Sequence, residues 1–405
     1  MSTRLKIAVV VQGRFHAFDM ARALLGLGHD VGVFTNYPRW AVGRFGLSAD
    51  NVRCIPSHGV TSRIVAAAAS PRLARAWEPI AHRMFGRWAA RELMRERWDA
   101  IHCWSGVSEE ILESTAASEA LTLLMRGSSH VTTQRRLLDE ESARVGVDLD
   151  KPSDWILERE LREYKLADRI LVLSSFSAQS FLDEGVRRER LALLPLGVDV
   201  RAFQAAPDAL EQRIQRIREG QPLTVVYVGA LSFRKGLWDL GTLTRSVDAG
   251  RFRFLMAGQV LPEARQFVTT FGSHVQLLGK IPQHQLPDVY RQGDLFVFPT
   301  IEDGFPVVLA QARAARLPII TTPNGAGSDI VESARQGWIV PIRSPRAIAE
   351  RLEWCDGNRD ALAEMIAAPE HASHSRDWAD VARDFESICF ANLSRGREPV
   401  VNRGH

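Results

Sequence analysis

Residues 295–341 constrain the fold of this 405-residue chain more than any other stretch. The segment opens with a short apolar run at 295–298, long enough for one buried parallel strand. A polar turn with Gly and Pro follows at 300–306, and the small and apolar residues of 307–315 predict a helix. A second apolar run occupies 317–321. The order strand, helix, strand predicts a βαβ unit of a parallel sheet.

The turn at 300–306 lies where the carboxyl end of a strand meets the N-terminus of a helix. Free backbone N–H groups and the helix dipole make that position a phosphate site. The same turn carries the carboxylates of Glu302 and Asp303, and carboxylates accept hydrogen bonds from sugar hydroxyls. A nucleotide sugar satisfies both features, because it brings a diphosphate to the helix and hydroxyl groups to the acids.

The same residues resemble the donor motif of a known family. The sequence EDGF at 302–305, a polar residue at 311 and the segment TTPNGAGSDIV are similar to the motif of retaining GT-B glycosyltransferases of family GT4. The usual form is Glu-Gly-Phe-Gly with a second Glu eight positions on. This chain has Asp303 in place of the first Glu, Gln311 in place of the second, and Pro306 in place of the second Gly.

The resemblance implies a role for each residue of the turn. Asp303 would contact the transferred sugar as a catalytic residue, with Glu302 supporting or replacing it, and Gln311 would hold the ribose without a charge. Pro306 has no N–H, so the diphosphate would rely on the neighbouring backbone amides. These are the amides of Gly304, Phe305 and Val307.

A second part of the resemblance follows the apolar run at 224–229. Arg234 and Lys235, with the Gly after them, are similar to the family's diphosphate clamp. Two cations there would neutralise the charge that builds on the departing diphosphate, a task that a metal ion performs in other transferases. Many members carry an Arg directly after the strand's Gly, where this chain has Ala230, and Arg234 is a candidate substitute. An exposed turn without a ligand is the alternative interpretation, and Lys235 is our predicted catalytic cation.

The first half of the chain has a ligand-facing loop of its own. The sequence RGSSH at 126–130 follows the apolar run at 121–125, which places it at the ligand-binding edge of the predicted sheet. The resemblance implies that His130 faces the donor sugar and donates a hydrogen bond to a hydroxyl or to the developing charge, and a buried structural His is the alternative. Arg126 and Ser128 are predicted on the acceptor side, where Arg126 would pair with an anionic group of the acceptor or brace the loop.

Two further loops complete the predicted donor site. Gly13 follows the first apolar run and permits close approach of the backbone to a ligand, although a plain tight turn explains it equally well. The loop GKIP at 279–282 resembles the one whose backbone faces the nucleobase, which places Ile281 at the base.

The resemblance covers nearly the whole chain and implies the GT-B fold. This is an α/β architecture of two Rossmann-like, doubly wound parallel-sheet domains that face each other across a cleft. We expect residues 1–200 to form the acceptor-binding domain, 201–221 a linker region and 222–378 the nucleotide-sugar-binding domain. Residues 379–405 would form a helix that packs back on the first domain, followed by a frayed tail.

Composition excludes several classes of function. A net charge of +3 at pH 7 argues against a polyanionic partner, and no segment resembles a module that reads nucleic acid. The four cysteines lie far apart without CxxC spacing, which predicts reduced, mostly buried thiols. The chain lacks an apolar stretch of membrane-spanning length and a secretory segment at its start, so we expect a cytoplasmic protein.

Residues 72–98 predict a basic helix with interleaved aromatic side chains. A helix of this kind can lie on the anionic inner face of a membrane. A solvated face of Arg side chains, backed by a stripe of core residues, explains the pattern more simply.

Together these features predict a glycosyltransferase that moves a sugar from a UDP- or GDP-sugar to a hydroxyl of a sugar, lipid-linked or other small-molecule acceptor. The resemblance implies that the transfer retains the configuration of the sugar. Biosynthesis of bacterial surface polysaccharide, glycolipid or glycoconjugate is the expected setting. We expect no cofactor and no metal, because the Asp-x-Asp at 148–150 follows no apolar run. A nucleotide-sugar epimerase of the same fold and a catalytically impaired sugar-nucleotide-binding homologue are the alternatives.

Overall fold

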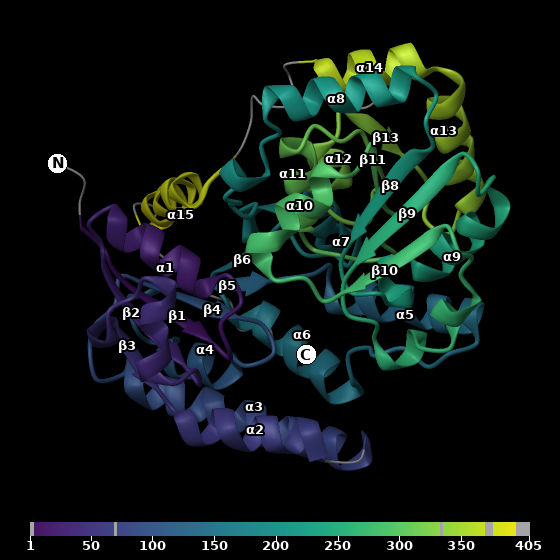
Figure 1. The fold of residues 1–405 in the computed structure, drawn as a ribbon. Helices are drawn as coiled ribbons and strands as arrows, with labels where there is room; N and C mark the ends of the chain where they lie inside the picture. The colour runs from purple at the N-terminus through teal and green to yellow at the C-terminus, as the bar shows by residue number, and fades with distance from the viewer. Residues whose placement is uncertain (1–3, 69–70, 333–334, 369–375, 394–405) are drawn as a thin grey trace.

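Two lobes, each built on a parallel β-sheet, make up the structure (Figure 1). It is a computed structural model that describes residues 4–68, 71–332, 335–368 and 376–393. Within these residues, the sheet of the first lobe has the strand order β3-β2-β1-β4-β5-β6-β7. Its strands are β1 Lys6–Val11, β2 Asp30–Thr35, β3 Val52–Cys54, β4 Ala100–Trp104, β5 Leu121–Arg126, β6 Arg169–Val172 and β7 Leu191–Leu193. The helices of this part of the chain are α1 Ala17–Gly26, α2 Pro56–Ala68, α3 Pro71–Leu93, α4 Glu109–Thr115, α5 Val131–Val145, α6 Asp154–Leu166 and α7 Ser175–Asp183.

The sheet of the second lobe has the strand order β10-β9-β8-β11-β12-β13. Its strands are β8 Leu223–Val228, β9 Phe252–Ala257, β10 Val275–Gly279, β11 Leu295–Phe298, β12 Ile319–Thr321 and β13 Gly337–Ile339. The helices that follow the first lobe in the chain are α8 Pro207–Arg218, α9 Leu237–Ser246, α10 Leu286–Arg291, α11 Val307–Ala314, α12 Gly327–Ile330, α13 Pro345–Gly357, α14 Arg359–Ala367 and α15 Trp378–Leu393. Every neighbouring pair of strands in both sheets is parallel.

The strands are the short apolar runs of the sequence, and most of their side chains are buried. In β1 five of six residues are buried, and in β11 all four are buried. Burial on both faces is expected of a parallel sheet that helices cover on both sides. The predicted architecture of two doubly wound parallel sheets is confirmed. The cysteines are free, and three of the four are buried, as the sequence predicts.

The predicted βαβ unit is β11–α11–β12. Strands β11 and β12 pair in parallel, with Phe296 opposite Ile319, and the hydroxyl of Thr321 donates to the carbonyl oxygen of Phe298 at 2.7 Å. The acidic turn therefore lies between the carboxyl end of β11 and the N-terminus of α11. This edge of the second sheet faces the first lobe, because Phe305 and Val307 pack against the core of that lobe.

Helix α5 joins the lobes, a connection that no pattern in the sequence predicts. The helix follows β5 of the first lobe, but Leu138 and Val145 are buried in the core of the second lobe. At its carboxyl end the guanidinium of Arg144 pairs with Asp239 of α9 at 2.7 Å. Glu141, which is fully buried, pairs with Arg343 of the second lobe at 3.0 Å.

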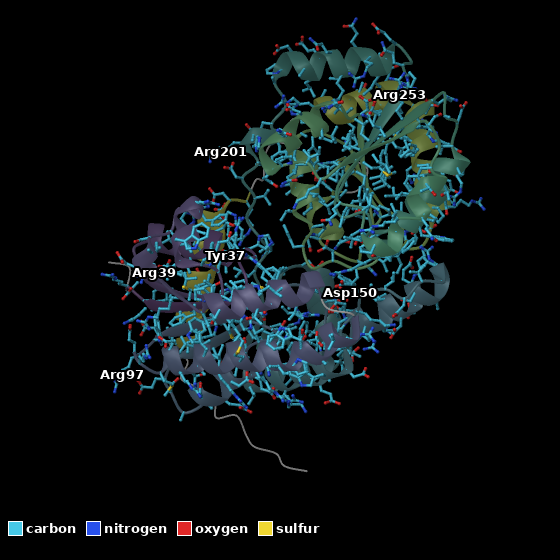
Figure 2. The ribbon with its side chains drawn as sticks, turned by 60° about the horizontal axis from the view of Figure 1, so that its bottom comes forward. Tyr37, Arg39, Arg97, Asp150, Arg201 and Arg253 are labelled. Atoms are coloured by element: carbon cyan, nitrogen blue, oxygen red, sulfur yellow. The ribbon has the colours of Figure 1, made fainter. Side chains whose placement is uncertain are left out.

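The chain crosses between the lobes twice. The first crossing follows β7, and Figure 2 shows Arg201 on this segment. The region 201–221 is predicted as a linker, whereas the structure forms α8 over most of it, and α8 packs against α14 of the second lobe. The second crossing leads into α15. The two crossings touch, because the N–H of Val198 donates to the carbonyl oxygen of Arg376 at 2.9 Å.

Helix α15 lies on the first lobe, beside α1 (Figure 1). Its buried residues Val381, Phe385 and Cys389 are part of the first lobe's core. The ring of His29, directly before β2, lies 3.3 Å from a carboxylate oxygen of Glu386 in the helix. The tail predicted to fray after this helix lies outside the described residues.

Candidate functional site

Lys235 and Asp303 meet at the edge of the second sheet that faces the first lobe. Lys235 lies on the loop after β8, and its Nζ is 2.5 Å from Oδ2 of Asp303. Both side chains are only 18% exposed. Burial lowers the pKa of Lys235, and the carboxylate of Asp303 opposes that shift. The structure thus brings together the predicted catalytic cation and the predicted sugar-binding acid.

Glu302 links the two lobes. Its Oε1 accepts hydrogen bonds from the backbone N–H and the hydroxyl of Ser129, both at 2.9 Å. Its Oε2 accepts from the side-chain amide of Gln134 at 3.0 Å and pairs with Arg234 at 2.8 Å. The carboxyl is fully buried, and burial alone would raise its pKa. The charges of Arg234 and Lys235 and the hydrogen bonds from Ser129 outweigh that effect and lower the pKa of Glu302 to about 2.

Gly304 lies directly against the loop after β5. A side chain at this position would place its Cβ 2.2 Å from the carbonyl oxygen of Gly127, so only glycine fits. The hydroxyl of Ser128 accepts a hydrogen bond from Arg234 at 3.1 Å. Ser128 therefore lies beside the predicted diphosphate clamp. We call this contact between the lobes, made by Ser128 and Ser129 with Arg234, Glu302 and Gly304, the seam.

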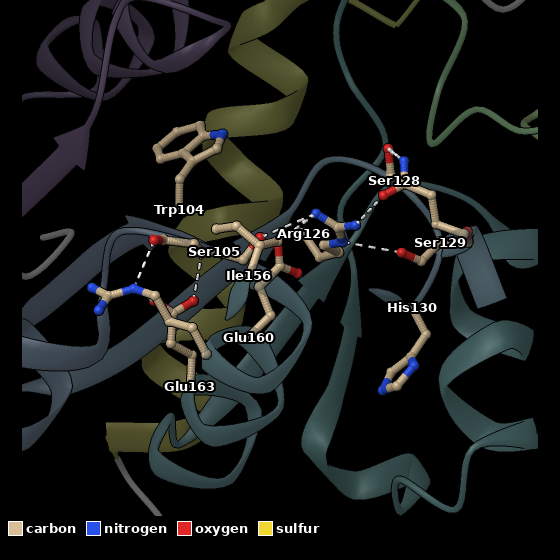
Figure 3. A network of polar contacts seen from close by, with 12 residues as sticks. Trp104, Ser105, Arg126, Ser128, Ser129, His130, Ile156, Glu160 and Glu163 are labelled. Carbon is tan, nitrogen blue, oxygen red and sulfur yellow. Dashed lines mark hydrogen bonds and ion pairs between the residues drawn. The ribbon is translucent and has the colours of Figure 1, made fainter. Parts of the chain in front are cut away.

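Arg126 braces its own loop. The guanidinium donates to the backbone oxygen of Ser129 at 3.0 Å and to the side-chain oxygen of Gln134 at 2.7 Å. It also pairs with Glu160 of α6 at 3.0 Å (Figure 3). Of the two roles that the sequence leaves open, bracing the loop is the one that these contacts support.

The side chain of His130 turns away from the seam. Figure 3 shows it pointing away from Ser128, and its ring contacts those of Tyr164 and Phe181, 5.0 and 4.8 Å between ring centroids. Its Nδ1 caps α5 by accepting a hydrogen bond from the backbone N–H of Thr132. Burial, and to a smaller degree Arg126, lowers the pKa of His130 to about 4. This arrangement does not place His130 against a donor sugar, and it matches the structural alternative.

His130 should make the protein more sensitive to acid. The folded-state pKa is below the ordinary value, so the unfolded chain binds the proton first, and stability falls as the pH drops from 6.5 toward 4. For one His the loss at pH 5 is on the order of 1–2 kcal/mol. His130→Asn keeps a capping side chain but cannot titrate. We expect it to be destabilising at pH 7.5 and distinctly less so at pH 5.

Urea unfolding at the two pH values tests this expectation. The control is His284→Asn, at an exposed position. This substitution should have a small effect on the unfolding free energy, of the same size at the two pH values. If the difference in unfolding free energy between the wild type and His130→Asn is the same at pH 7.5 and pH 5, the expectation is wrong.

Gln311 is buried inside the second lobe, where its side-chain oxygen accepts a hydrogen bond from the hydroxyl of Tyr290 at 3.0 Å. This position does not present the amide to a ribose, contrary to the predicted contact. The reason is that α11 turns position 311 toward α10, and the buried phenol of Tyr290 needs an acceptor.

Gly13 and Ile281 occupy the loops that the sequence predicts. Gly13 has φ +96, a conformation that suits glycine, and its N–H donates to the side chain of Asn36 at 2.7 Å. The turn after β1 is thereby tied to the end of β2. Ile281 follows β10 at the edge of the second sheet and packs partly against its core.

Three residues of the site escape the sequence analysis. Ser129 and Gln134 hold Glu302, and His16 begins α1 with its ring stacked on Trp378, 5.8 Å between centroids. Burial lowers the pKa of His16, and among the smaller opposing effects is the charge of Asp303, which therefore acts on the first loop of the other lobe. The only signal in the sequence is that Ser129 and His16 lie in loops after strands, as Gly13 and Ser128 do, whereas Gln134 lies inside α5.

Metal ligands do not gather in the described part of the chain. No group of three or more His, Cys, Asp or Glu side chains among the described residues could hold a metal ion. The charges at the seam are instead those of Arg234 and Lys235 opposite Glu302 and Asp303.

Each lobe of the chain matches a family of known proteins. Residues 14–202 match the family described as Glycosyltransferase Family 4, and residues 222–355 match the family described as Glycosyl transferases group 1. The structure superposes on that of HepE from Anabaena, solved with UDP and glucose, with a TM-score of 0.66 at 13% identity. The match covers 96% of this chain and 100% of HepE.

Two curated relatives are similar in sequence over about half their length. The colanic acid biosynthesis glycosyltransferase WcaL of Escherichia coli K12 is 26% identical over 242 residues, which cover 56% of this chain and 58% of WcaL. A GDP-mannose-dependent phosphatidylinositol monomannoside mannosyltransferase of Mycobacterium tuberculosis is 27% identical over 244 residues, which cover 56% of this chain and 62% of the relative. With both lobes matched in order, the chain belongs to the GT4-type glycosyltransferases of group 1, which have the GT-B fold.

Proposed function

We propose that this chain transfers a sugar from a nucleoside-diphosphate sugar to an acceptor hydroxyl, with retention of configuration. The observation that carries the proposal is the position of Lys235 beside the opening turn of α11. Within the described residues, the backbone N–H groups of Gly304, Phe305 and Val307 donate to no acceptor of the chain. A diphosphate placed there would receive hydrogen bonds from these amides and the positive charge of Lys235.

The charges at the seam suit the departure of a nucleoside diphosphate. Glycosyl transfer passes through an oxocarbenium-like state, so stabilising the leaving group is the largest contribution that we expect from the protein. The ammonium of Lys235 would contact both the carboxylate of Asp303 and the phosphate oxygens. We see no well-placed nucleophile for a covalent intermediate, and we favour attack on the same face as the leaving phosphate. This chemistry needs no metal ion and no other cofactor.

The residues divide into those that touch substrate and those that hold them. Asp303 would contact the transferred sugar, because its carboxylate is partly exposed and lies at the seam. Glu302 is fully used by Ser129, Gln134 and Arg234, so its role is to fix the lobes and to orient Arg234. Ile281 would lie near the base. The acceptor would approach from the first lobe, past the loops of Gly13 and Ser128.

A screen of UDP- and GDP-sugars tests the proposal. We expect one donor to raise the melting temperature of the wild type, and Lys235→Ala to lose that shift. Similar proteins use either base, since HepE was solved with UDP and the mannosyltransferase depends on GDP-mannose. Indifference to every activated sugar would reject the proposal. NMR of the donor alone distinguishes an epimerase, which converts it without an acceptor, and absent turnover despite binding would identify an impaired homologue.

We propose a lipid-linked or surface-polysaccharide acceptor, met at the inner face of the bacterial membrane by an otherwise cytoplasmic protein. Helices α2 and α3 lie side by side at the outer edge of the first lobe (Figure 1). Helix α3 buries a stripe with Phe85 and Leu93, as the simpler interpretation predicts, yet Ile80 and Met84 are exposed on another face. Arg83, Arg87 and Arg91 share that exposed face by helical spacing. No described helix has both the length and the apolar character to cross a bilayer.

Sedimentation with vesicles of anionic phospholipid tests this contact. Ile80→Asp should weaken binding, because it removes apolar contact and adds a charge that anionic lipid repels. The control is Leu277→Asp, at an exposed apolar position of the second lobe. Equal binding of the wild type and both variants would exclude a role for α3.

A further inference from the structure

A cavity of about 430 Å³ lies at the junction of the two lobes, outside the proposed donor site. Both chain crossings line it, through residues 195–205 and through Arg376. The third wall is the carboxyl-terminal half of α11, with Ala310, Arg313 and Ala314 on one face. Neither Lys235 nor Asp303 contributes to the lining, and Phe305 is the one residue shared with the acidic turn. The volume is in the range of small-molecule sites.

The lining combines arginine side chains with apolar ones. Three arginines line the cavity, Arg313, Arg316 and Arg376, and Arg376 pairs with Asp384 of α15 at 2.6 Å. The one acid of the lining is Asp329. That carboxylate already accepts a hydrogen bond from the backbone N–H of Ser175 in the first lobe at 2.9 Å. The apolar walls include Leu196, Val198, Phe305 and Ile330. Arginine is the side chain best suited to phosphate, because its planar fork donates two hydrogen bonds at once.

Arg316 is held in a conformation that ordinary side chains avoid. Its φ is +55, in the left-handed region, directly after the last turn of α11. Glycine is the usual residue at such a helix end, and any other side chain there is strained. The Arg316 guanidinium donates to the backbone oxygen of Ala367 at 3.2 Å, and none of the ion pairs among the described residues involves Arg316. Arg316 therefore keeps a cation without an ion pair at the wall of the cavity, in a conformation that costs backbone strain.

From these observations we propose that the junction cavity binds a small phosphate monoester with an apolar body. The phosphate lies among the arginines, and the apolar part lies against Phe305 and Leu196. Such a ligand contacts both crossings and α11 at once, so it favours one relative position of the lobes. Because the N-terminus of α11 carries the proposed diphosphate site, the ligand changes the affinity for the donor, a consequence that rests on the proposed function.

Phenyl phosphate is a suitable probe, with phenol and inorganic phosphate as its two halves. Calorimetric titration of the full chain should show binding of phenyl phosphate and at least tenfold weaker binding of either half. Arg316→Gly should weaken the binding at least tenfold, with an unchanged or higher melting temperature, because glycine relieves the backbone strain. Lys235→Ala should bind the probe as the wild type does, which separates this cavity from the donor site.

Three results would overturn the inference. They are no binding of phenyl phosphate to the wild type, binding to Arg316→Gly within twofold of the wild type, and loss of binding in Lys235→Ala. These measurements use no nucleotide sugar, so their failure leaves the proposed transferase function untouched. If no donor binds but the probe results hold, the cavity stands and only its coupling to a donor is rejected.

Discussion

Replacing Lys235 by Ala should lower kcat/KM for sugar transfer by a factor of about 10³, the size of effect seen when one preorganised group is removed from a developing charge. The ammonium is mostly buried and lies 2.5 Å from Asp303, so its charge acts with little screening by water. Removing it also leaves that carboxylate without its cation, next to the incoming diphosphate. Both effects oppose departure of the nucleotide. The measurement is steady-state kinetics with the donor that the melting screen identifies.

Two variants give this prediction its controls. Lys235→Arg keeps the positive charge but changes its geometry, so it should retain more activity than Lys235→Ala. His130→Asn should keep kcat/KM within about threefold of the wild type, because the ring of His130 lies in the first lobe, away from the seam. The reverse ranking, with His130→Asn more damaging than Lys235→Ala at matched donor binding, would reject the role of Lys235.

Local features of the site follow from the sequence because they depend on neighbours in the chain. The unit β11–α11–β12 is set by two apolar runs and a turn, and its position fixes Asp303 and the free amides of Gly304 and Phe305. Lys235 follows in the same way from the turn after β8. The carboxyl ends of parallel strands meet at one edge of a sheet, so the two turns had to come together.

Features that depend on how the lobes dock do not follow from the sequence. Glu302 and Ser129 are 173 residues apart, and no local pattern shows that the carboxylate is consumed by the other lobe. Arg234 is a candidate for the Arg missing at Ala230, but the structure commits it to Glu302 and Ser128. Helix α5 has few apolar residues of its own, and its buried positions become visible only when the second lobe packs on it.

Polar residues in a motif are equally ambiguous without the fold. Gln311 stands where the family has a ligand-binding Glu, and its amide pairs with Tyr290 inside the second lobe. His130 stands in a ligand-facing loop, and its ring caps α5. In each case the backbone is where the sequence predicts, and the rotation of one side chain decides between ligand and core. Nothing in a single sequence fixes that rotation, because the partner comes from another element.

Gly304→Ala should damage both stability and catalysis, although it adds a single methyl group. The added Cβ would lie 2.2 Å from the carbonyl oxygen of Gly127 and 3.0 Å from the backbone nitrogen of Ser128. These are backbone atoms of a loop that Arg126 and Glu302 hold in place, so the lobes must separate at the seam. We expect a loss of about 1–3 kcal/mol in the free energy of unfolding. A displacement of about 1 Å in the phosphate-binding amides should lower kcat/KM by about 10².

The matched control is Gly26→Ala, at the last residue of α1, where an added Cβ meets nothing within 4 Å. Alanine is the better helix former, so this variant should be neutral or more stable by up to about 1 kcal/mol, with unchanged kinetics. The measurements are urea unfolding and steady-state kinetics. Equal unfolding free energies and equal kcat/KM values for Gly304→Ala and Gly26→Ala would contradict the prediction. If Gly304→Ala loses activity but keeps its stability, the methyl group is accommodated by a shift of the turn alone, and the seam between Glu302 and Ser129 contributes less to folding than its buried contacts suggest. If it loses both, close contact between the lobes is what holds the phosphate-binding amides in register with Lys235.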